Sequence, residues 1–130
     1  MSDNRAELNI LVVDDSDFSR NLIIGMLKEE GFKLIREASG AEAALSSMKD
    51  KNPHVVITDI VMPNISGIEL TQKITQTYND IAVIVISSLS QEHIVLEAIG
   101  AGARDFMAKP IQKQQLVESL DKIMSELNIK

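Results

Sequence analysis

Three short runs of this chain consist almost entirely of valine, isoleucine and leucine, without the alternation of apolar and polar residues that marks a half-exposed strand. Such runs are typical of strands buried on both faces, as in a parallel sheet covered by helices on each side. They are Ile10–Val13, Val55–Thr58 and Val83–Ile86, and two mixed runs, Leu34–Ala38 and Asp105–Ala108, fit strands at the edges of the same sheet.

The longer segments between these runs carry apolar residues at helical spacing, which predicts helices that each bury one stripe. The stripes are Phe18, Leu22 and Met26; Leu70, Ile74 and Tyr78; Ile94, Val95, Ala98 and Ile99; and Leu116, Leu120, Ile123, Met124 and Leu127. Ser39-x-x-Glu42 and Ser66-x-x-Glu69 predict capping boxes at two helix starts. Gly31 is expected to follow a helix end.

The order of strands and helices predicts an α/β fold, a doubly wound, five-stranded parallel (βα)5 sheet. Right-handed crossovers leave few topologies, and the flavodoxin-like strand order 2-1-3-4-5 is the natural one for five strands. We expect one domain over residues 1–130, with an ordered core from about residue 8 to residue 128. The first polar residues are expected to form a frayed tail, and the last helix to run nearly to Lys130.

Composition excludes several classes of function. The 130 residues include no cysteine, 13 Lys and Arg, and 19 Asp and Glu, for a net charge of −6. A disulfide framework, a thiolate zinc site and a cysteine nucleophile are therefore excluded. The acidic balance argues against nucleic-acid binding, and the longest apolar run, Ile81 to Ile86, is far short of the roughly 20 residues that span a membrane. We expect a cytoplasmic protein that binds neither nucleic acid nor membrane.

Polar residues follow four of the predicted strands, and they are Asp14, Asp15, Asp59, Ser87 and Lys109. The carboxyl ends of parallel strands meet at one edge, where ligands bind in open α/β sheets. Three clustered carboxylates repel one another, and hard oxygen ligands of this kind suit Mg²⁺. A hydroxyl and an ammonium beside them suit phosphoryl oxygens. The pattern predicts a Mg²⁺ site with phosphoryl chemistry.

This chemistry needs a nucleophile. His54 precedes the third strand and so belongs to the opposite end of the sheet, and His93 is expected on a helix face. A carboxylate can itself accept a phosphoryl group and form an aspartyl phosphate. Asp59, at the end of a middle strand, is the candidate phosphoacceptor.

These residues resemble the receiver domain of bacterial two-component response regulators, and most of all the single-domain chemotaxis-type regulators. The resemblance covers about residues 8–128. It rests on Asp14-Asp15, Asp59, Met62-Pro63-Asn64-x-x-Gly67, Ser87 and Glu97-Ala98-x-x-Ala101-Gly102-Ala103-x-Asp105-Phe106 leading into Lys109-Pro110.

The resemblance implies that Asp59 accepts a phosphoryl group from the phosphohistidine of a sensor histidine kinase. Asp15, Asp59 and the backbone carbonyl of Val61 would bind Mg²⁺ directly, and Asp14 would act mainly through water. Lys109 would pair with the phosphoryl oxygens or, at rest, with Asp59. By the same resemblance the chain is a switch that catalyses its own phosphorylation and dephosphorylation, and is not an enzyme in the ordinary sense.

The resemblance also implies a switch. Ser87 would donate a hydrogen bond to the phosphoryl group, Phe106 would rotate inward, and the peptide before Pro110 would be cis. The altered surface would cover the fourth helix, fifth strand and fifth helix, and would dock a downstream target protein or a histidine phosphotransfer protein. It would include Leu89, Ile94, Val95, Phe106, Ile111 and Gln112.

Two positions near the predicted phosphoacceptor carry apolar residues where polar ones could position the water that removes the phosphoryl group. Val61 lies two residues beyond Asp59, and Leu89 lies two residues beyond Ser87. Apolar side chains there would exclude or misplace the attacking water, so we expect a long-lived phosphorylated form.

Other interpretations remain open at this point. Asp15-Ser16-Asp17 matches the DxD motif of haloacid-dehalogenase-type phosphatases, but that interpretation leaves Asp59 without a role. A degenerate receiver that only binds proteins is the second alternative. We expect Asp17 to cap the first helix. Chemotaxis, a phosphorelay and a phosphate sink all fit the sequence.

Overall fold

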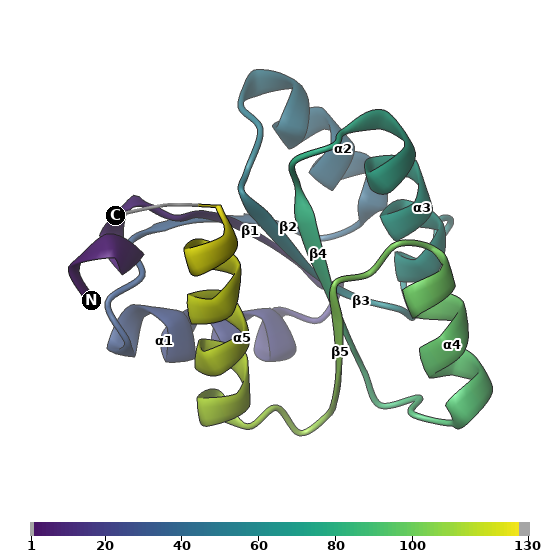
Figure 1. Cartoon of the computed structure of the whole chain (residues 1–130). Coiled ribbons are helices and arrows are strands. Elements are labelled where there is room, and N and C mark those ends of the chain that lie inside the picture. The colour runs from purple at the N-terminus through teal and green to yellow at the C-terminus, as the bar shows by residue number, and fades with distance from the viewer. Residues whose placement is uncertain (1, 128–130) are drawn as a thin grey trace.

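The computed structural model describes residues 2–127, which form a parallel sheet between two layers of helices (Figure 1). The strands are β1 (Asn9–Val13), β2 (Leu34–Ala38), β3 (Val55–Asp59), β4 (Ala82–Ser87) and β5 (Asp105–Ala108). The helices are α1 (Asp17–Glu29), α2 (Ala41–Asp50), α3 (Gly67–Thr77), α4 (Glu92–Gly100) and α5 (Lys113–Glu126). The strand order is β2-β1-β3-β4-β5, which confirms the predicted fold class and topology. The expected core limit at residue 128 and the helix end near Lys130 lie outside the described residues.

The sheet separates two apolar cores, because successive residues of a strand point to opposite faces. Leu11 and Val13 of β1 belong to the core that also holds buried residues of α2, α3 and α4. Ile10 and Val12 belong to the other core, with buried residues of α1 and α5. Figure 1 shows the same division, with α1 and α5 on one side and α2, α3 and α4 on the other. The central strands are buried on both faces, as their sequence predicts.

The predicted helix stripes are confirmed for α3 and α5 but not for α1. On α1 the buried residues are Ile23 and Leu27, whereas Phe18 is 76% exposed and Leu22 is 50% exposed. Two apolar stripes run along this helix, and the core takes the one that faces Phe32 and β1. The α4 prediction is also wrong in part, since Ala98 is its buried residue and Ile99 is exposed.

The helix ends agree only partly with the predicted capping. Ser66 and Glu69 form the expected capping box of α3, and Gly31 follows α1 with a left-handed φ of 92°. The expected box at Ser39 is wrong, because α2 begins after Gly40 and no side chain caps it. The cap of α1 is Ser16, whose hydroxyl accepts a hydrogen bond from Ser19 N, and not Asp17, which is already in the first turn.

The residues before β1 are not a frayed tail. Ser2–Glu7 form a 3-10 helix, η1. Arg5 Nη2 is 2.7 Å from Asp121 Oδ2 of α5, and Arg5 Nη1 donates to the backbone carbonyl of Glu30 at 2.8 Å. The Arg5 guanidinium also lies 5.4 Å from the centre of the Phe32 ring, so one charged side chain holds the segment on the α1–α5 layer. Within the described residues, the helices are too short or too polar to span a membrane.

Candidate functional site

The carboxyl edge of the sheet carries a cluster of three acidic residues. Val13 of β1 is in register with Thr58 of β3, so Asp14 and Asp59 leave neighbouring strands at the same level. One carboxylate oxygen each from Asp14, Asp15 and Asp59 lies within 4.8 Å of the others. The predicted meeting of these residues at one edge is therefore found in the structure.

Hydrogen bonds hold both the side chain and the backbone amide of Asp14. Its side chain is 1% exposed. Oδ1 accepts a hydrogen bond from Ser16 N at 2.9 Å, and Oδ2 accepts one from Lys109 Nζ at 3.3 Å. Its amide donates to the carbonyl of Ala38 on β2 at 3.1 Å. The carboxylate is thus buried with its partners, as a charged group in a protein interior must be.

Asp59 is held between a backbone donor and a cation. Its Oδ1 accepts from Ile60 N at 2.8 Å, and Lys109 Nζ is 3.1 Å from its Oδ2. Burial raises the pKa of Asp59, and Lys109 opposes this shift. Burial alone would lower the pKa of Lys109, but Asp59 and Asp14 outweigh it and raise that pKa. Lys109 therefore stays charged and joins the two carboxylates.

The remaining predicted residues lie on the neighbouring strands. Ser87 ends β4, is fully buried, and its Oγ accepts a hydrogen bond from Leu89 N at 3.0 Å. Lys109 N donates to the carbonyl of Ser87, and the Lys109–Pro110 peptide is cis, as the resemblance implied. Phe106 pairs with Val85 in the sheet and packs, partly buried, against the core beneath α3 and α4.

Two predicted residues of the rim are exposed and apolar. Val61 follows β3 and is 58% exposed, and Leu89 follows β4 and is partly exposed. The histidines lie elsewhere, as expected. His54 precedes β3 at the opposite end, where its Nδ1 accepts a hydrogen bond from Asn9 N, and His93 is exposed on α4.

The donor set fits a hard divalent cation. Three carboxylates supply oxygen ligands, two of them are largely buried, and Asp15 is exposed toward solvent. Mg²⁺ prefers such ligands together with several waters, and an open side suits that hydration. The ammonium of Lys109 bridges Asp14 and Asp59 but leaves Asp15 without contact to it. The cluster therefore has ligand capacity beyond what Lys109 uses.

Gly67 has a role that sequence reasoning missed. Its amide donates to the carbonyl of Ile60 at 2.8 Å, which brings the start of α3 against the residue after Asp59. A Cβ added at Gly67 would overlap the backbone carbonyl of Asp59. Only glycine lets the helix approach the phosphoacceptor candidate this closely. The motif containing Gly67 was visible in the sequence, but the contact depends on the fold.

Arg20 of α1 is the second residue that sequence reasoning missed. Its Nη1 donates to the carbonyl of Asp14 at 2.6 Å, its Nε to Glu37 at 2.7 Å, and its Nη2 to Asp17 at 2.6 Å. The spacing of Asp17 and Arg20 signals only an ion pair within one helix. The contacts with β1 and β2 become visible only when the chain is folded.

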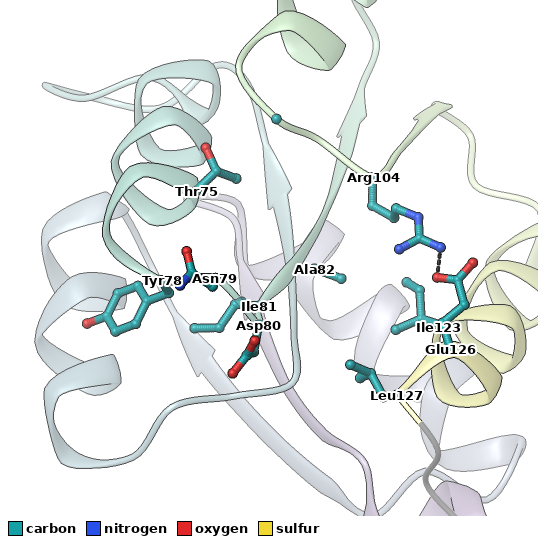
Figure 2. A pocket seen from close by; sticks show the side chains of 11 residues that line it. Thr75, Tyr78, Asn79, Asp80, Ile81, Ala82, Arg104, Ile123, Glu126 and Leu127 are labelled. Atoms are coloured by element: carbon teal, nitrogen blue, oxygen red, sulfur yellow. Dashed lines mark ion pairs between the residues drawn. The ribbon is translucent and has the colours of Figure 1, made fainter.

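A hollow lies far from the acidic cluster, at the end of the sheet where β4 and β5 begin. It has a volume of about 380 Å³, and its lining includes Thr75, Tyr78 and Asp80. Figure 2 shows Arg104 and Glu126 paired at one side of it. None of the residues predicted for the site lines this hollow.

Comparison with known proteins gives consistent matches. A family model described as the response regulator receiver domain matches residues 10–121. Chemotaxis protein CheY of Thermotoga maritima is 35% identical over 114 residues, which are 88% of this chain and 95% of that protein. The CheY of Bacillus subtilis is 35% identical over 116 residues, 89% of this chain and 97% of that protein. A chain in the crystal structure of the CheX-CheY-BeF3-Mg+2 complex from Borrelia burgdorferi aligns with a TM-score of 0.83 and 30% identity, over 90% of this chain and 89% of that chain.

Proposed function

The chain belongs to the family of response regulator receiver domains, and we propose that it is a phosphorylation-activated switch whose Asp59 accepts a phosphoryl group from the phosphohistidine of a sensor histidine kinase. The observation that carries the proposal is the position of Asp59, whose carboxylate lies 3.1 Å from the Lys109 ammonium and within 4.8 Å of carboxylate oxygens of Asp14 and Asp15. A cytoplasmic location is part of the proposal, and the absence of cysteine fits a reducing compartment.

The transfer needs little covalent chemistry from the protein. A carboxylate oxygen of Asp59 forms a bond to phosphorus while the P–N bond of the donor breaks, and the bonding pair returns to the imidazole nitrogen, which takes up a proton from water. Charge spreads over the phosphoryl oxygens in the transition state, so positioning and nearby cations supply most of the catalysis. Lys109, already 3.1 Å from Asp59, is placed to supply one of these cations. Because the domain supplies these groups itself, it catalyses its own phosphorylation. We include catalysis of its own dephosphorylation in the proposal.

We assign Mg²⁺ as the cofactor, held by Asp15, Asp59 and the Val61 carbonyl, with Asp14 acting mainly through water. Bound there, Mg²⁺ would neutralise charge that develops on the phosphoryl oxygens. The clustered carboxylate oxygens support this assignment. The CheX-CheY-BeF3-Mg+2 complex from Borrelia burgdorferi, in which a structural relative occurs together with this ion, supports it further.

The output side of the proposal rests on Ser87 and Phe106. The Ser87 hydroxyl accepts a hydrogen bond from Leu89 N. Its own proton can therefore be donated to a phosphoryl oxygen. Phe106 lies two strands from Asp59 and packs against the core that α4 covers, so a move of Ser87 can be passed to α4 through it. Leu96 and Ile99 are exposed apolar residues of α4, which supports protein docking over α4, β5 and α5. The partner there is a downstream target protein or a histidine phosphotransfer protein.

A separate groove supports docking of the phosphoryl donor. A largely apolar groove of about 290 Å³ is lined by residues that include Phe18, Leu22, Met26 and Ile111, and Lys109 is also part of its lining. A donor protein must bring its phosphohistidine to Asp59, and this groove lies beside that path. The exposure of Phe18, which the helix pattern alone would bury, fits such a role.

The phosphatase alternative loses support from Asp17. That reading needs Asp17 as a general acid facing the nucleophile Asp15, whereas Asp17 is 84% exposed and bonded to Arg20. Turnover of a phosphomonoester substrate by the purified protein would restore the alternative.

The proposal is tested by intact mass after incubation with acetyl phosphate and Mg²⁺. We expect a gain of one phosphoryl group in the wild type, none in Asp59→Ala, and an unchanged gain in the control Asp50→Ala, which alters an exposed aspartate at the end of α2. Leaving out Mg²⁺ should abolish the gain. If neither acetyl phosphate nor a phosphorylated histidine kinase modifies the wild type, the chain is a degenerate receiver that only binds proteins.

A further inference from the structure

One partly buried arginine, Arg20, touches the loop that carries two of the three clustered carboxylates. The side chain of Arg20 is 13% exposed, although its acidic partners Asp17 and Glu37 are both more than half exposed. Ion pairs with such exposed partners contribute little to stability. The third contact differs in kind, because Nη1 donates to the main-chain carbonyl of Asp14 at 2.6 Å.

That carbonyl belongs to the peptide that joins Asp14 to Asp15. The Asp14 amide is fixed by Ala38, and its side chain is fixed by Ser16 and Lys109. The carbonyl contact from Arg20 settles the remaining freedom, which is the orientation of the peptide plane. Asp15 is the next residue after this peptide, and no described contact holds its exposed side chain. The direction of Asp15 therefore depends on the peptide that Arg20 holds.

Arg20 ties this peptide to two separate elements. Glu37 lies on β2, and Asp17 lies in the first turn of α1. The planar guanidinium presents its donors in a fixed fork, so its bonds to Glu37 and Asp17 also fix where Nη1 points. A lysine carries the same charge but has one nitrogen on a flexible stem, and it cannot make all three contacts in this geometry.

We propose that Arg20 is a positioning residue for the metal site, which orients the Asp14–Asp15 peptide so that the carboxylates meet one cation. The inference rests on the proposed function only in taking the acidic cluster as a Mg²⁺ site. Arg20 itself binds neither the metal nor the phosphoryl group. It acts as the outer partners of metal ligands do, by holding a ligand in place.

A simple electrostatic role makes the opposite prediction. Arg20 carries a positive charge beside the acidic cluster, so this charge alone would oppose the binding of Mg²⁺. On that view, replacing Arg20 with a neutral residue tightens Mg²⁺ binding, and replacing it with lysine changes nothing. If Arg20 positions the loop, both replacements weaken Mg²⁺ binding.

The experiment is a Mg²⁺ titration of the unphosphorylated full chain, followed by backbone amide NMR signals, for the wild type, Arg20→Lys and Arg20→Gln. The matched control is Arg36→Lys. Arg36 also donates to several acceptors, the carbonyls of Ser47 and Lys51 and the Ser47 hydroxyl, but it does so at the end of α2. We expect the Mg²⁺ dissociation constant to rise about tenfold in both Arg20 variants and to stay unchanged in Arg36→Lys.

Thermal unfolding of each variant separates positioning from loss of structure. If Arg20→Gln does not fold, Arg20→Lys decides, together with hydrogen exchange of the Ser16 amide, which is bonded to Asp14. Faster exchange at Ser16 in Arg20→Lys, with the control unchanged, supports the inference. An unchanged dissociation constant in Arg20→Lys, tighter binding in Arg20→Gln, or a wild type that takes up no Mg²⁺ overturns it. A wild type that binds Mg²⁺ but accepts no phosphoryl group would sink the proposed function alone.

Discussion

Lys109 reaches Asp59 across an intervening strand: Nζ lies 3.1 Å from Oδ2, although the two residues are 50 positions apart and β4 runs between their strands. The same nitrogen lies 3.3 Å from Asp14 Oδ2 on the far side of β3. One ammonium thus links three parts of the sheet edge and compensates two carboxylates that are largely out of water.

Removing this ammonium should destabilise the metal-free protein. We expect Lys109→Met to lower the free energy of unfolding by about 2 kcal/mol, less than for a fully buried pair because Lys109 is 24% exposed. Urea unfolding with a chelator present measures the loss, and added Mg²⁺ should recover part of it because the cation binds only the folded cluster.

The control for this variant is Lys113→Met. Lys113 also pairs with two acidic residues, Glu29 and Glu30, but it is 45% exposed. Its replacement should lower the unfolding free energy far less than Lys109→Met does, because ion pairs between solvent-exposed side chains contribute little. Equal losses in the two variants would show that burial of the carboxylates does not set the cost.

The apolar residues at the rim should give the phosphorylated form a long life. Val61 and Leu89 offer no hydrogen bond to an attacking water, so Val61→Asn should speed loss of the phosphoryl group, followed by mass or by released phosphate. Leu34→Asn, at an exposed leucine that starts β2, should leave the rate unchanged. Rapid loss from the wild type that Val61→Asn barely alters would count against this explanation.

Two glycines should respond to alanine in opposite directions. In Gly67→Ala the new methyl meets the Asp59 backbone, so we expect a loss of about 2 kcal/mol in stability and slower phosphorylation. Gly25 lies inside α1 with open space around the position of a Cβ, so Gly25→Ala should gain about 1 kcal/mol. Denaturant unfolding of both variants tests the pair, and a stabilising Gly67→Ala would contradict the close approach.

His54 should make stability depend on pH. Burial, together with the nearby Lys51, lowers the pKa of His54 from its ordinary value of 6.5, and Nδ1 accepts a hydrogen bond from Asn9 N. The unfolded chain therefore binds more protons than the folded one just below pH 6.5, and stability falls as the pH drops through this range. We expect His54→Asn to reduce this slope.

The matched control for the pH experiment is His93→Asn, because His93 is exposed on α4. Its slope should equal that of the wild type. If stability depends on pH as steeply in both histidine variants as in the wild type, the acid sensitivity comes from carboxylates. It then does not come from His54 and its hydrogen bond with Asn9.

The sheet was predictable because its three central strands are buried on both faces. Continuous runs such as Ile10–Val13 admit few other structures, and the order of elements then fixes the topology. Helix α1 was harder, because residues at the spacing of Phe18 and Leu22 run parallel to the stripe of Ile23 and Leu27. Spacing cannot say which of two apolar stripes meets the core, since that depends on how the helix lies on the sheet.

The residues of the site also fall into those that the sequence could predict and those that it could not. Asp14, Asp59 and Lys109 could be predicted to meet, because each ends or directly follows a strand and parallel strands end together. Arg20 and Gly67 could not, because one acts through a main-chain carbonyl and the other through the absence of a side chain. A single sequence shows neither contact, even though the motif that contains Gly67 is visible in it.

The order of Asp14, Asp59 and Lys109 along the chain also bears on how the protein is made. A ribosome releases the two carboxylates well before the lysine that compensates them, which lies 50 residues beyond Asp59. A nascent sheet of β1, β2 and β3 would therefore bury like charges without their counter-ion. The acidic edge of the sheet therefore becomes electrostatically balanced only once β5 and the lysine that follows it have emerged.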